Sequence, residues 1–196
     1  MEELKHKFWI DTRLNKESML YLNQAISESE KNSKEIINRQ WIVSKLLKDK
    51  DDWFFETILK GLTERLFLSD WNNYYKYHIE KEELIPKFVM DRFWVNYQYQ
   101  HEFNPLHDHG GLFTFVIFIK IPTHWKEQHN KNKDIFRAKC ASDFVFVWSE
   151  KGQSNSLLKQ HIHLSPEDEG RILFFPTWLQ HLVYPFYDTE EERITI

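Results

Sequence analysis

Histidine is the residue type in this chain that most clearly could do chemistry. The sequence contains 10 histidines, and four of them form two pairs with one residue between the members: His107 with His109, and His161 with His163. In an extended segment, residues i and i+2 point to the same side, so either pair can present two imidazoles to one metal ion. At this histidine frequency, however, chance alone supplies about half of one such pair, so the surroundings must distinguish the two.

The two pairs stand in different surroundings. His107 and His109 follow an Asn-Pro turn and precede two consecutive glycines and a strongly apolar segment. We therefore expect this pair at a strand end, at the mouth of a β structure. His161 and His163 lie inside an expected strand, where the favoured interpretation is ordinary strand or surface histidines.

A third group of residues follows in the last part of the chain. The segment GRILFFPTWLQHLVYPF contains His181, and an Arg-x-Thr group, Arg193 and Thr195, comes after it. The order of an HxH pair, a later single histidine and an Arg-x-Ser/Thr group resembles the Fe(II)/2-oxoglutarate-dependent oxygenases, of the kind found in marine phages and bacteria. The resemblance runs from about Trp94 to the C-terminus and is sharpest in EFNPLHDHGGLFTFVIFIKIP and GRILFFPTWLQHLVYPF.

That resemblance implies a cofactor and a set of ligands. It implies Fe(II), 2-oxoglutarate as co-substrate and O2, with His107, His109 and His181 as metal ligands. The usual motif of the family has Asp at the position of His109, and this chain departs from it. Asp108 is the nearest carboxylate, but as a neighbour of His107 it points to the opposite side of an extended strand, so it could bind only if the backbone bulges there.

The resemblance also implies how the co-substrate is held. Arg193 offers a bidentate guanidinium to the distal carboxylate of 2-oxoglutarate, and Thr195, on the same face of a strand, adds a hydroxyl. A tyrosine on the strand before the metal pair often contacts 2-oxoglutarate in similar enzymes. Tyr97 and Tyr99 share a face of that strand, and a core tyrosine with a satisfied hydroxyl is an equally good interpretation of each.

The implied reaction is hydroxylation of a substrate C–H bond with release of succinate and CO2. Similar proteins are often suspected of prolyl or peptidyl hydroxylation, and the residues leave a peptide and a small molecule equally open as substrate. One alternative is a cupin-like metal-binding protein or a dioxygenase that does not use 2-oxoglutarate, although residues 110–119 lack the usual cupin glutamate. Another is a metal-free binding or structural protein.

The elements that must hold these side chains differ between the two parts of the chain. Over about residues 1–85, apolar residues recur at spacings of three and four, which is typical of amphipathic helices. Such stripes are formed by Met19, Leu22 and Ile26, by Ile37 and Trp41, and by Phe55, Ile58, Leu59, Leu62 and Leu66. Asp51 and Asp52 are candidate caps for the last helix.

From Pro86 onward, β-branched and aromatic runs between turn residues predict strands. The seven segments are Phe93–Gln100, Phe113–Ile121, Asp143–Trp148, Lys159–Leu164, Arg171–Phe175, His181–Phe186 and Glu192–Ile196. Residues 126–133 are expected to be a polar loop. Without a helical period between the strands, a sandwich or barrel is favoured over alternating strands and helices.

The predicted fold class is therefore mainly β with N-terminal helices (α+β), and the resemblance specifies a double-stranded β-helix, that is, a jelly-roll or cupin-like barrel. We expect one oxygenase domain over residues 1–196, with a helical buttress at about 1–85 and a jelly-roll core at about 86–196. At 196 residues the chain has the usual length of one domain.

Composition narrows the list of partners and compartments. A net charge of −4 without a basic block disfavours nucleic acid as a partner. No apolar run approaches the roughly 20 residues of a membrane-spanning helix, and no signal peptide is evident. Cys140 is the single cysteine, which excludes an intrachain disulfide and favours a cytoplasmic location. The oligomeric state stays open.

Overall fold

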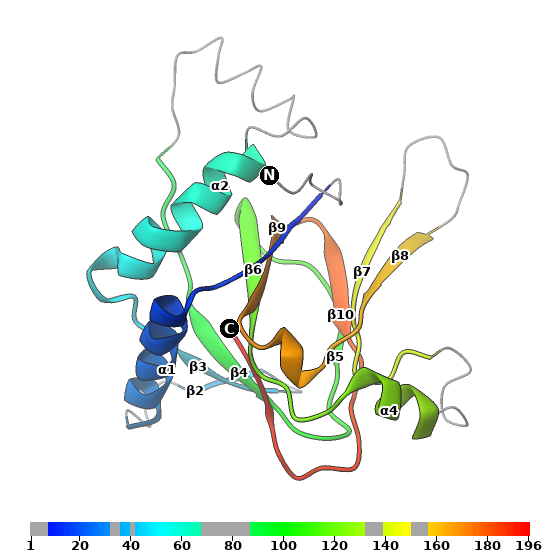
Figure 1. Cartoon of the computed structure of the whole chain (residues 1–196). Coiled ribbons are helices and arrows are strands. Elements are labelled where there is room, and N and C mark those ends of the chain that lie inside the picture. The colour runs from blue at the N-terminus through cyan, green and yellow to red at the C-terminus, as the bar shows by residue number, and fades with distance from the viewer. Residues whose placement is uncertain (1–7, 32–35, 40–41, 68–86, 132–138, 150–156) are drawn as a thin grey trace.

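Two antiparallel β-sheets form the body of the protein, with α1 (Lys16–Lys31) and α2 (Lys60–Phe67) at the left of the view and α4 (Trp125–Lys131) at the lower right (Figure 1). The structure is a computed structural model that describes residues 8–31, 36–39, 42–67, 87–131, 139–149 and 157–196. The larger sheet has the strand order β1-β9-β6-β11-β4-β3-β2, and the smaller sheet has the order β5-β10-β7-β8. The protein is therefore mainly β, as predicted.

The strands are short and come mostly from the second part of the chain. Their bounds are β1 Ile10–Arg13, β2 Ile36–Arg39, β3 Ile42–Leu46, β4 Trp94–Gln98, β5 Asn104–His107, β6 Phe113–Lys120, β7 Phe144–Ser149, β8 Leu157–Ile162, β9 Arg171–Pro176, β10 Gln180–Val183 and β11 Arg193–Thr195. All seven predicted strand segments are confirmed. Four further strands, β1, β2, β3 and β5, were not predicted.

The helical elements of the described residues are α1 (Lys16–Lys31), η1 (Lys50–Asp52), the π-helical stretch η2 (Phe55–Leu59), α2 (Lys60–Phe67), α4 (Trp125–Lys131) and η4 (Pro166–Asp168). The stripe that begins at Met19 lies in α1, and the stripe of residues 55–66 lies in η2 and α2, so both helix predictions are confirmed.

Three local predictions in and around these elements are wrong. Ile37 lies in strand β2 and not in a helix, while its expected partner Trp41 lies outside the described residues. Residues 126–131 belong to helix α4 and not to a loop. The cap of the helix around residue 55 is Asp49 and not Asp51 or Asp52. The two carboxylate oxygens of Asp49 accept hydrogen bonds from the backbone N–H groups of Phe54 and Phe55 at 2.8 and 2.9 Å.

Alternation along the strands divides the core into two clusters. On β9, Ile172 and Phe174 belong to the cluster that joins the larger sheet to α1 and α2, whereas Leu173 and Phe175 belong to the cluster shared with the smaller sheet. Successive residues of a strand point to opposite faces, so one strand can serve both layers. The larger sheet therefore lies between a helical layer and the smaller sheet.

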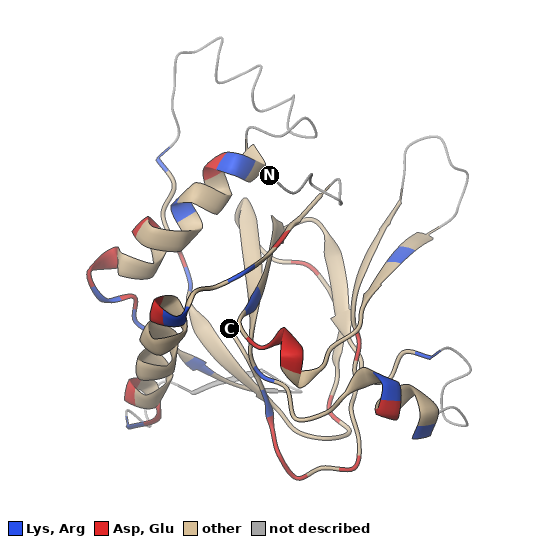
Figure 2. Cartoon of the chain, viewed as in Figure 1, with Lys and Arg blue, Asp and Glu red and all other residues tan. Residues whose placement is uncertain are grey.

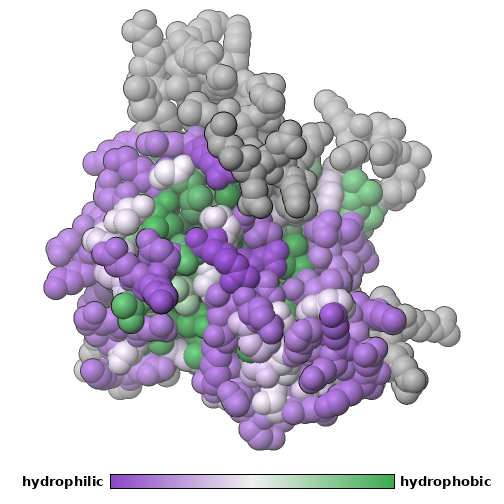
Figure 3. All heavy atoms as spheres, viewed as in Figure 1, coloured by the Kyte–Doolittle hydropathy of each residue, from purple (hydrophilic) through white to green (hydrophobic). Residues whose placement is uncertain are grey.

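Most charged residues lie on the outside of this arrangement, with Asp143 and Arg193 as buried exceptions. Lys, Arg, Asp and Glu gather on the helices and connecting loops, while the strands are mostly uncharged (Figure 2). The face seen in Figure 3 is largely hydrophilic, with an apolar area around α2. None of the helices in the described segments combines the length and apolar character that crossing a lipid bilayer demands.

Candidate metal centre

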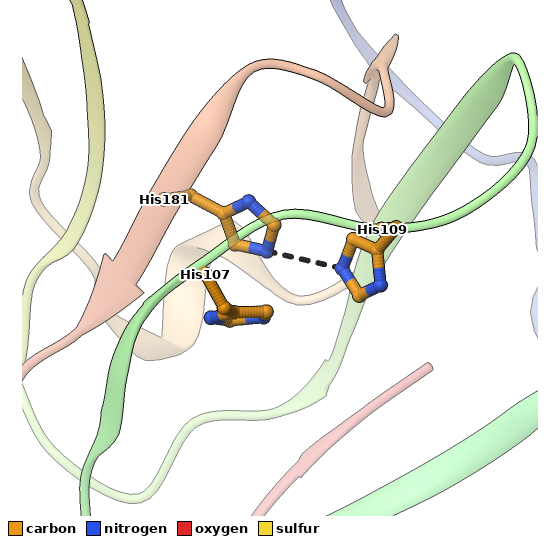
Figure 4. Close-up of side chains that lie close together, drawn as sticks. All are labelled: His107, His109 and His181. Carbon is orange, nitrogen blue, oxygen red and sulfur yellow. Dashed lines mark hydrogen bonds between the residues drawn. The ribbon is translucent and has the colours of Figure 1, made fainter.

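Three histidines from separate elements converge beside the smaller sheet (Figure 4). His107 ends β5, His109 lies two residues beyond it, and His181 lies in β10. One ring nitrogen from each lies within 4.8 Å of the others. The Nε2 atoms of His109 and His181 are 3.3 Å apart, and the rings of His107 and His181 have centroids 4.2 Å apart. The structure thus brings together the three histidines that the sequence singled out.

Strand pairing sets the positions of these side chains. β5 and β10 are antiparallel, with His107 directly opposite His181. The backbone N–H of His109 donates to the Thr177 carbonyl at 3.1 Å, which ties the following loop to the β9–β10 turn. That loop needs a glycine, because Gly111 has φ +92° while its carbonyl accepts the Thr177 hydroxyl at 2.8 Å.

Backbone carbonyls fix which ring nitrogen faces the centre. Nδ1 of His107 donates to the Pro105 carbonyl at 2.7 Å, and Nδ1 of His181 donates to the Leu179 carbonyl at 3.2 Å. With the proton held on Nδ1, the lone pair of each ring is on Nε2. Nε2 of His107 also lies 3.4 Å from Nδ2 of Asn104. In both rings, Nε2 is therefore the atom that can bind a metal.

Electrostatics favours the same neutral form. Burial, together with the neighbouring imidazoles of His107 and His109, lowers the pKa of His181 to about 3. An imidazole with so low a pKa is uncharged at neutral pH, and uncharged imidazole is the metal-binding species. Imidazole suits iron, zinc, copper and nickel, so the donor set fits the Fe(II) that the sequence predicted.

Asp108 is not part of the converging group. The potential metal ligands are His107, His109 and His181, and the exposed Asp108 instead lines a neighbouring cavity.

A small cavity of about 100 Å³ adjoins the three histidines. Thr195 of β11 and Asn96 of β4 both line it, and these two residues are paired across the two strands. Asn96 accepts a hydrogen bond of 2.6 Å from the hydroxyl of Ser44, which lines the cavity too. Sequence reasoning missed Asn96 and Ser44, although Asn96 lies within a predicted strand and alternates with Tyr97.

Arg193 lies two residues before Thr195 in β11 and faces the same interior side. It is paired with Gln98, and only 1% of its surface is exposed. Its Nη2 donates to the carbonyl and hydroxyl oxygens of Ser142 at 3.0 and 2.6 Å, and its Nε has no hydrogen-bond partner among the described residues. Burial lowers the pKa of Arg193 to about 10, although the nearby Asp143 carboxylate raises it.

Tyr97 of β4 and Tyr99, which directly follows that strand, alternate with Asn96 and Gln98 and lie on the other face, away from the histidines. The Tyr97 hydroxyl donates to Glu30 of α1 at 3.0 Å, and its ring packs in the cluster between the larger sheet and the helices. Tyr99 is 46% exposed. The structure does not bring either tyrosine to the candidate metal centre, and we assign neither of them a contact with the co-substrate.

A larger cavity of about 470 Å³ lies next to the metal centre. It shares His109, Trp94 and Phe115 with the smaller cavity, so the two adjoin at the centre. Phe55 and Leu59 of η2 form part of its wall, together with the glycines that follow His109. The volume falls within the range of about 300–1,000 Å³ that is usual for small-molecule sites.

Comparisons with solved structures show the fold. A prolyl-4-hydroxylase from Pseudomonas putida is similar over 97% of this chain and 90% of its own, with 9% identity and a TM-score of 0.55. An oxidoreductase of the 2OG-Fe(II) oxygenase family from Burkholderia pseudomallei is similar over 98% and 83%, with 11% identity and a TM-score of 0.52. The non-heme alpha ketoglutarate dependent carbocyclase SnoK from nogalamycin biosynthesis is similar over 96% and 77%, with 9% identity and a TM-score of 0.60.

A comparison with family models gives the family. No curated protein matches the chain significantly. A family model described as "Putative 2OG-Fe(II) oxygenase" matches residues 92–196, which is more than half of the chain and includes His107, His109 and His181. The chain therefore belongs to the 2OG-Fe(II) oxygenases, oxidoreductases that use Fe(II), 2-oxoglutarate and O2.

Proposed function

We propose that this protein is a hydroxylase in which His107, His109 and His181 hold Fe(II). The observation that carries the proposal is the convergence of three ring nitrogens within 4.8 Å, two of them in a tautomer fixed by backbone carbonyls. Three ligands grouped on one side leave the other positions of an ion open to a co-substrate and O2. Iron bound there supplies the redox chemistry that couples the conversion of 2-oxoglutarate to succinate and CO2 with hydroxylation of a C–H bond.

Arg193 and Thr195 bind the distal carboxylate of 2-oxoglutarate in this proposal. Residues 193 and 195 share the interior face of β11, and Thr195 lines the small cavity beside the histidines. The buried guanidinium still has an N–H group without a partner among the described residues, at Nε. A carboxylate that accepts from Nε would satisfy this group and supply the negative charge that a buried guanidinium requires.

The larger cavity is the proposed substrate site. Its wall combines aromatic and aliphatic side chains with a few polar groups, among them Arg92 and Asp108. Such a cavity suits a small molecule or one side chain of a peptide, including a prolyl ring. The likeness to a prolyl-4-hydroxylase supports the peptide choice. His109 lines both cavities, so a substrate in the larger cavity would lie beside a ligand of the iron.

We also infer that the two sheets are the walls of a double-stranded β-helix. The eight strands β4 to β11 are divided equally between the sheets, with β4-β11-β6-β9 contiguous in one and β5-β10-β7-β8 in the other. This order is the strand order of a jelly roll. Residues 86–196 then form the jelly-roll core of a single domain, and residues 1–85 form a buttress that contributes β1, β2 and β3 besides its helices.

Anaerobic titration of the Fe(II)-loaded protein with 2-oxoglutarate tests the proposal. Chelation of ferrous iron by a 2-oxo acid produces a weak visible charge-transfer band. We expect the band in the unmodified protein and in a His101→Asn control, which changes an exposed histidine outside the site. We expect its loss in His181→Ala.

The other outcomes identify the alternatives. Iron binding without the band would refute the use of 2-oxoglutarate and favour a cupin-like metal protein. Equally negligible iron in the unmodified protein and in His181→Ala would refute the metal centre. A band together with succinate release, but no oxygenated product from any peptide or small molecule, would refute the hydroxylase assignment.

A further inference from the structure

A second group of histidines surrounds one buried carboxylate. Asp143 has no exposed surface, and three imidazoles donate to it. Nε2 of His129 and Nδ1 of His163 both lie 3.0 Å from its Oδ1, and Nδ1 of His161 lies 2.8 Å from its Oδ2. The histidine pair interpreted from the sequence as ordinary strand residues therefore forms half of a compact four-residue group.

Three elements distant in the sequence build this group. His129 lies in α4, Asp143 immediately precedes β7, and His163 immediately follows β8. The pairing of Val145 with His161 sets β7 and β8 in a register that brings residues 143 and 163 to the same end of the two strands. Since Asp143 and Val145 share a face, His161 of β8 and His163 just beyond it both reach the carboxylate.

Further contacts hold α4 and its histidine in place. The Trp125 N–H donates to the Leu164 carbonyl at 3.0 Å, and the buried Gln128 exchanges two hydrogen bonds of 2.9 Å with the backbone of Tyr187. The Trp125 ring stacks on His163, with centroids 4.6 Å apart, and meets the His129 ring edge-on at 5.3 Å. The imidazoles therefore have little freedom to turn away.

This group is separate from the candidate iron centre. His181 is paired with Phe146 and stacks on Phe144, so it contacts the residues of β7 that face the larger sheet. Asp143 precedes Phe144 and points to the opposite face. The two groups thus use opposite faces of the smaller sheet and share no ligand.

We propose that His129, Asp143 and His163 form a second metal site, for a divalent transition-metal ion of the zinc type. One ligand atom from each of the three lies within 4.8 Å of the others. Around a tetrahedral ion with bonds of about 2.0–2.1 Å, neighbouring ligand atoms are about 3.3 Å apart. The 3.0 Å contacts of Asp143 with His129 and His163 are within a few tenths of an ångström of that spacing, so two of the three ligand pairs already stand near the distance that an ion requires.

The remaining histidine and the solvent complete the site. His161 positions the carboxylate by donating to Oδ2, and a carboxylate held in this way keeps Oδ1 directed at the ion. The side chain of His163 is 40% exposed, which gives an ion a path from solvent and leaves its fourth position to water. Two imidazoles and one carboxylate suit zinc and its neighbours in the first transition row better than magnesium or calcium.

Titration of the chelator-stripped protein with Co²⁺, followed by its ligand-field absorption, tests the proposal. We expect the unmodified chain to bind two equivalents and His181→Ala one. His163→Ala and His129→Gln should each weaken the second site by about 100-fold or more, because even loss of an outer partner costs roughly 10- to 100-fold. His101→Asn is the matched control and should bind as the unmodified chain does.

Thermal unfolding in the presence and absence of Co²⁺ separates a metal site from a hydrogen-bonded group. Added Co²⁺ should raise the Tm of His181→Ala but not that of His181→Ala/His163→Ala. One equivalent in the unmodified chain, unaffected by His163→Ala and His129→Gln, would overturn the proposal. One equivalent that His163→Ala abolishes and His181→Ala leaves intact would support this site and contradict the iron centre instead.

Discussion

Replacing Arg193 by methionine is the most direct test of the co-substrate site. Methionine keeps an unbranched apolar side chain at this position but removes the guanidinium, whose carbon lies 4.9 Å from the centroid of the Phe186 ring, and with it the charge and all N–H donors. A charge-assisted hydrogen bond contributes about 1.5–3 kcal/mol, so loss of the proposed contact at Nε costs at least about 1.5 kcal/mol. At about 1.4 kcal/mol per factor of ten, the Kd for 2-oxoglutarate should rise by about 10-fold or more.

The protein itself should tolerate this change. Replacement of a buried charge by an apolar side chain of similar size is often nearly neutral for stability. Ser142 loses two hydrogen bonds from Arg193, but its hydroxyl stays 3.3 Å from that of Thr123. Metal content should be unchanged, since Arg193 is not among the converging ligands.

The assay is the anaerobic charge-transfer titration, with iron content measured in the same samples. Arg193→Lys keeps the charge but loses the planar guanidinium. Its affinity for 2-oxoglutarate should therefore fall between that of the unmodified protein and that of Arg193→Met. A 2-oxo acid without the distal carboxylate should bind the unmodified protein and Arg193→Met equally weakly. A Kd for 2-oxoglutarate within threefold of the unmodified value in Arg193→Met would refute the assignment of Arg193.

Three further substitutions test stability, and chemical denaturation measures the effect of each. Asp49→Ala removes the acceptor of the Tyr21 hydroxyl and of two backbone N–H groups, and should lower the free energy of unfolding by about 2–4 kcal/mol; a loss below about 0.5 kcal/mol would contradict it. Gly111→Ala forces a side chain onto φ +92° and should cost about 1–3 kcal/mol. Gly61→Ala, in helix α2 with open space around it, should instead stabilise by about 0.5–1 kcal/mol, and equal effects at the two glycines would exclude the backbone explanation.

Hydrophobic periodicity carried most of the fold prediction, and its failures have physical causes. The predicted strands of the second part have buried apolar residues that make a pattern, as in β7. β1 has only its first residue buried, and β5 is a four-residue strand with a proline, so neither gives a recognisable pattern. The α4 sequence is almost entirely polar, and its two buried residues, Gln128 and His129, are held by hydrogen bonds and not by apolar packing.

Residues of the candidate iron centre could be predicted where the sequence has a motif. Where only the alternation of residues along a strand was available, the prediction did not hold. The family prediction is confirmed, and its motifs identified three histidines that the structure brings together. Alternation shows that Tyr97 and Tyr99 share a face but cannot show which face, and β4 turns Asn96 toward the centre instead. No motif identifies Asp143, because its imidazole partners come from two other segments, around His129 and around His161 and His163, that only the tertiary structure brings to it.

The surroundings of Arg193 favour the binding of an anion beside it. Its described hydrogen-bond partners are the carbonyl and hydroxyl of Ser142 and the amide of Gln98, all of them uncharged. The neighbouring carboxylate of Asp143 is already occupied by three imidazole donors. A buried guanidinium without an ion pair among the described residues is costly unless a charged ligand completes it. A cation at the second metal site would offset the negative charge of the same Asp143 carboxylate. Arg193 would then be less well compensated, so occupancy of that site should increase the affinity for 2-oxoglutarate.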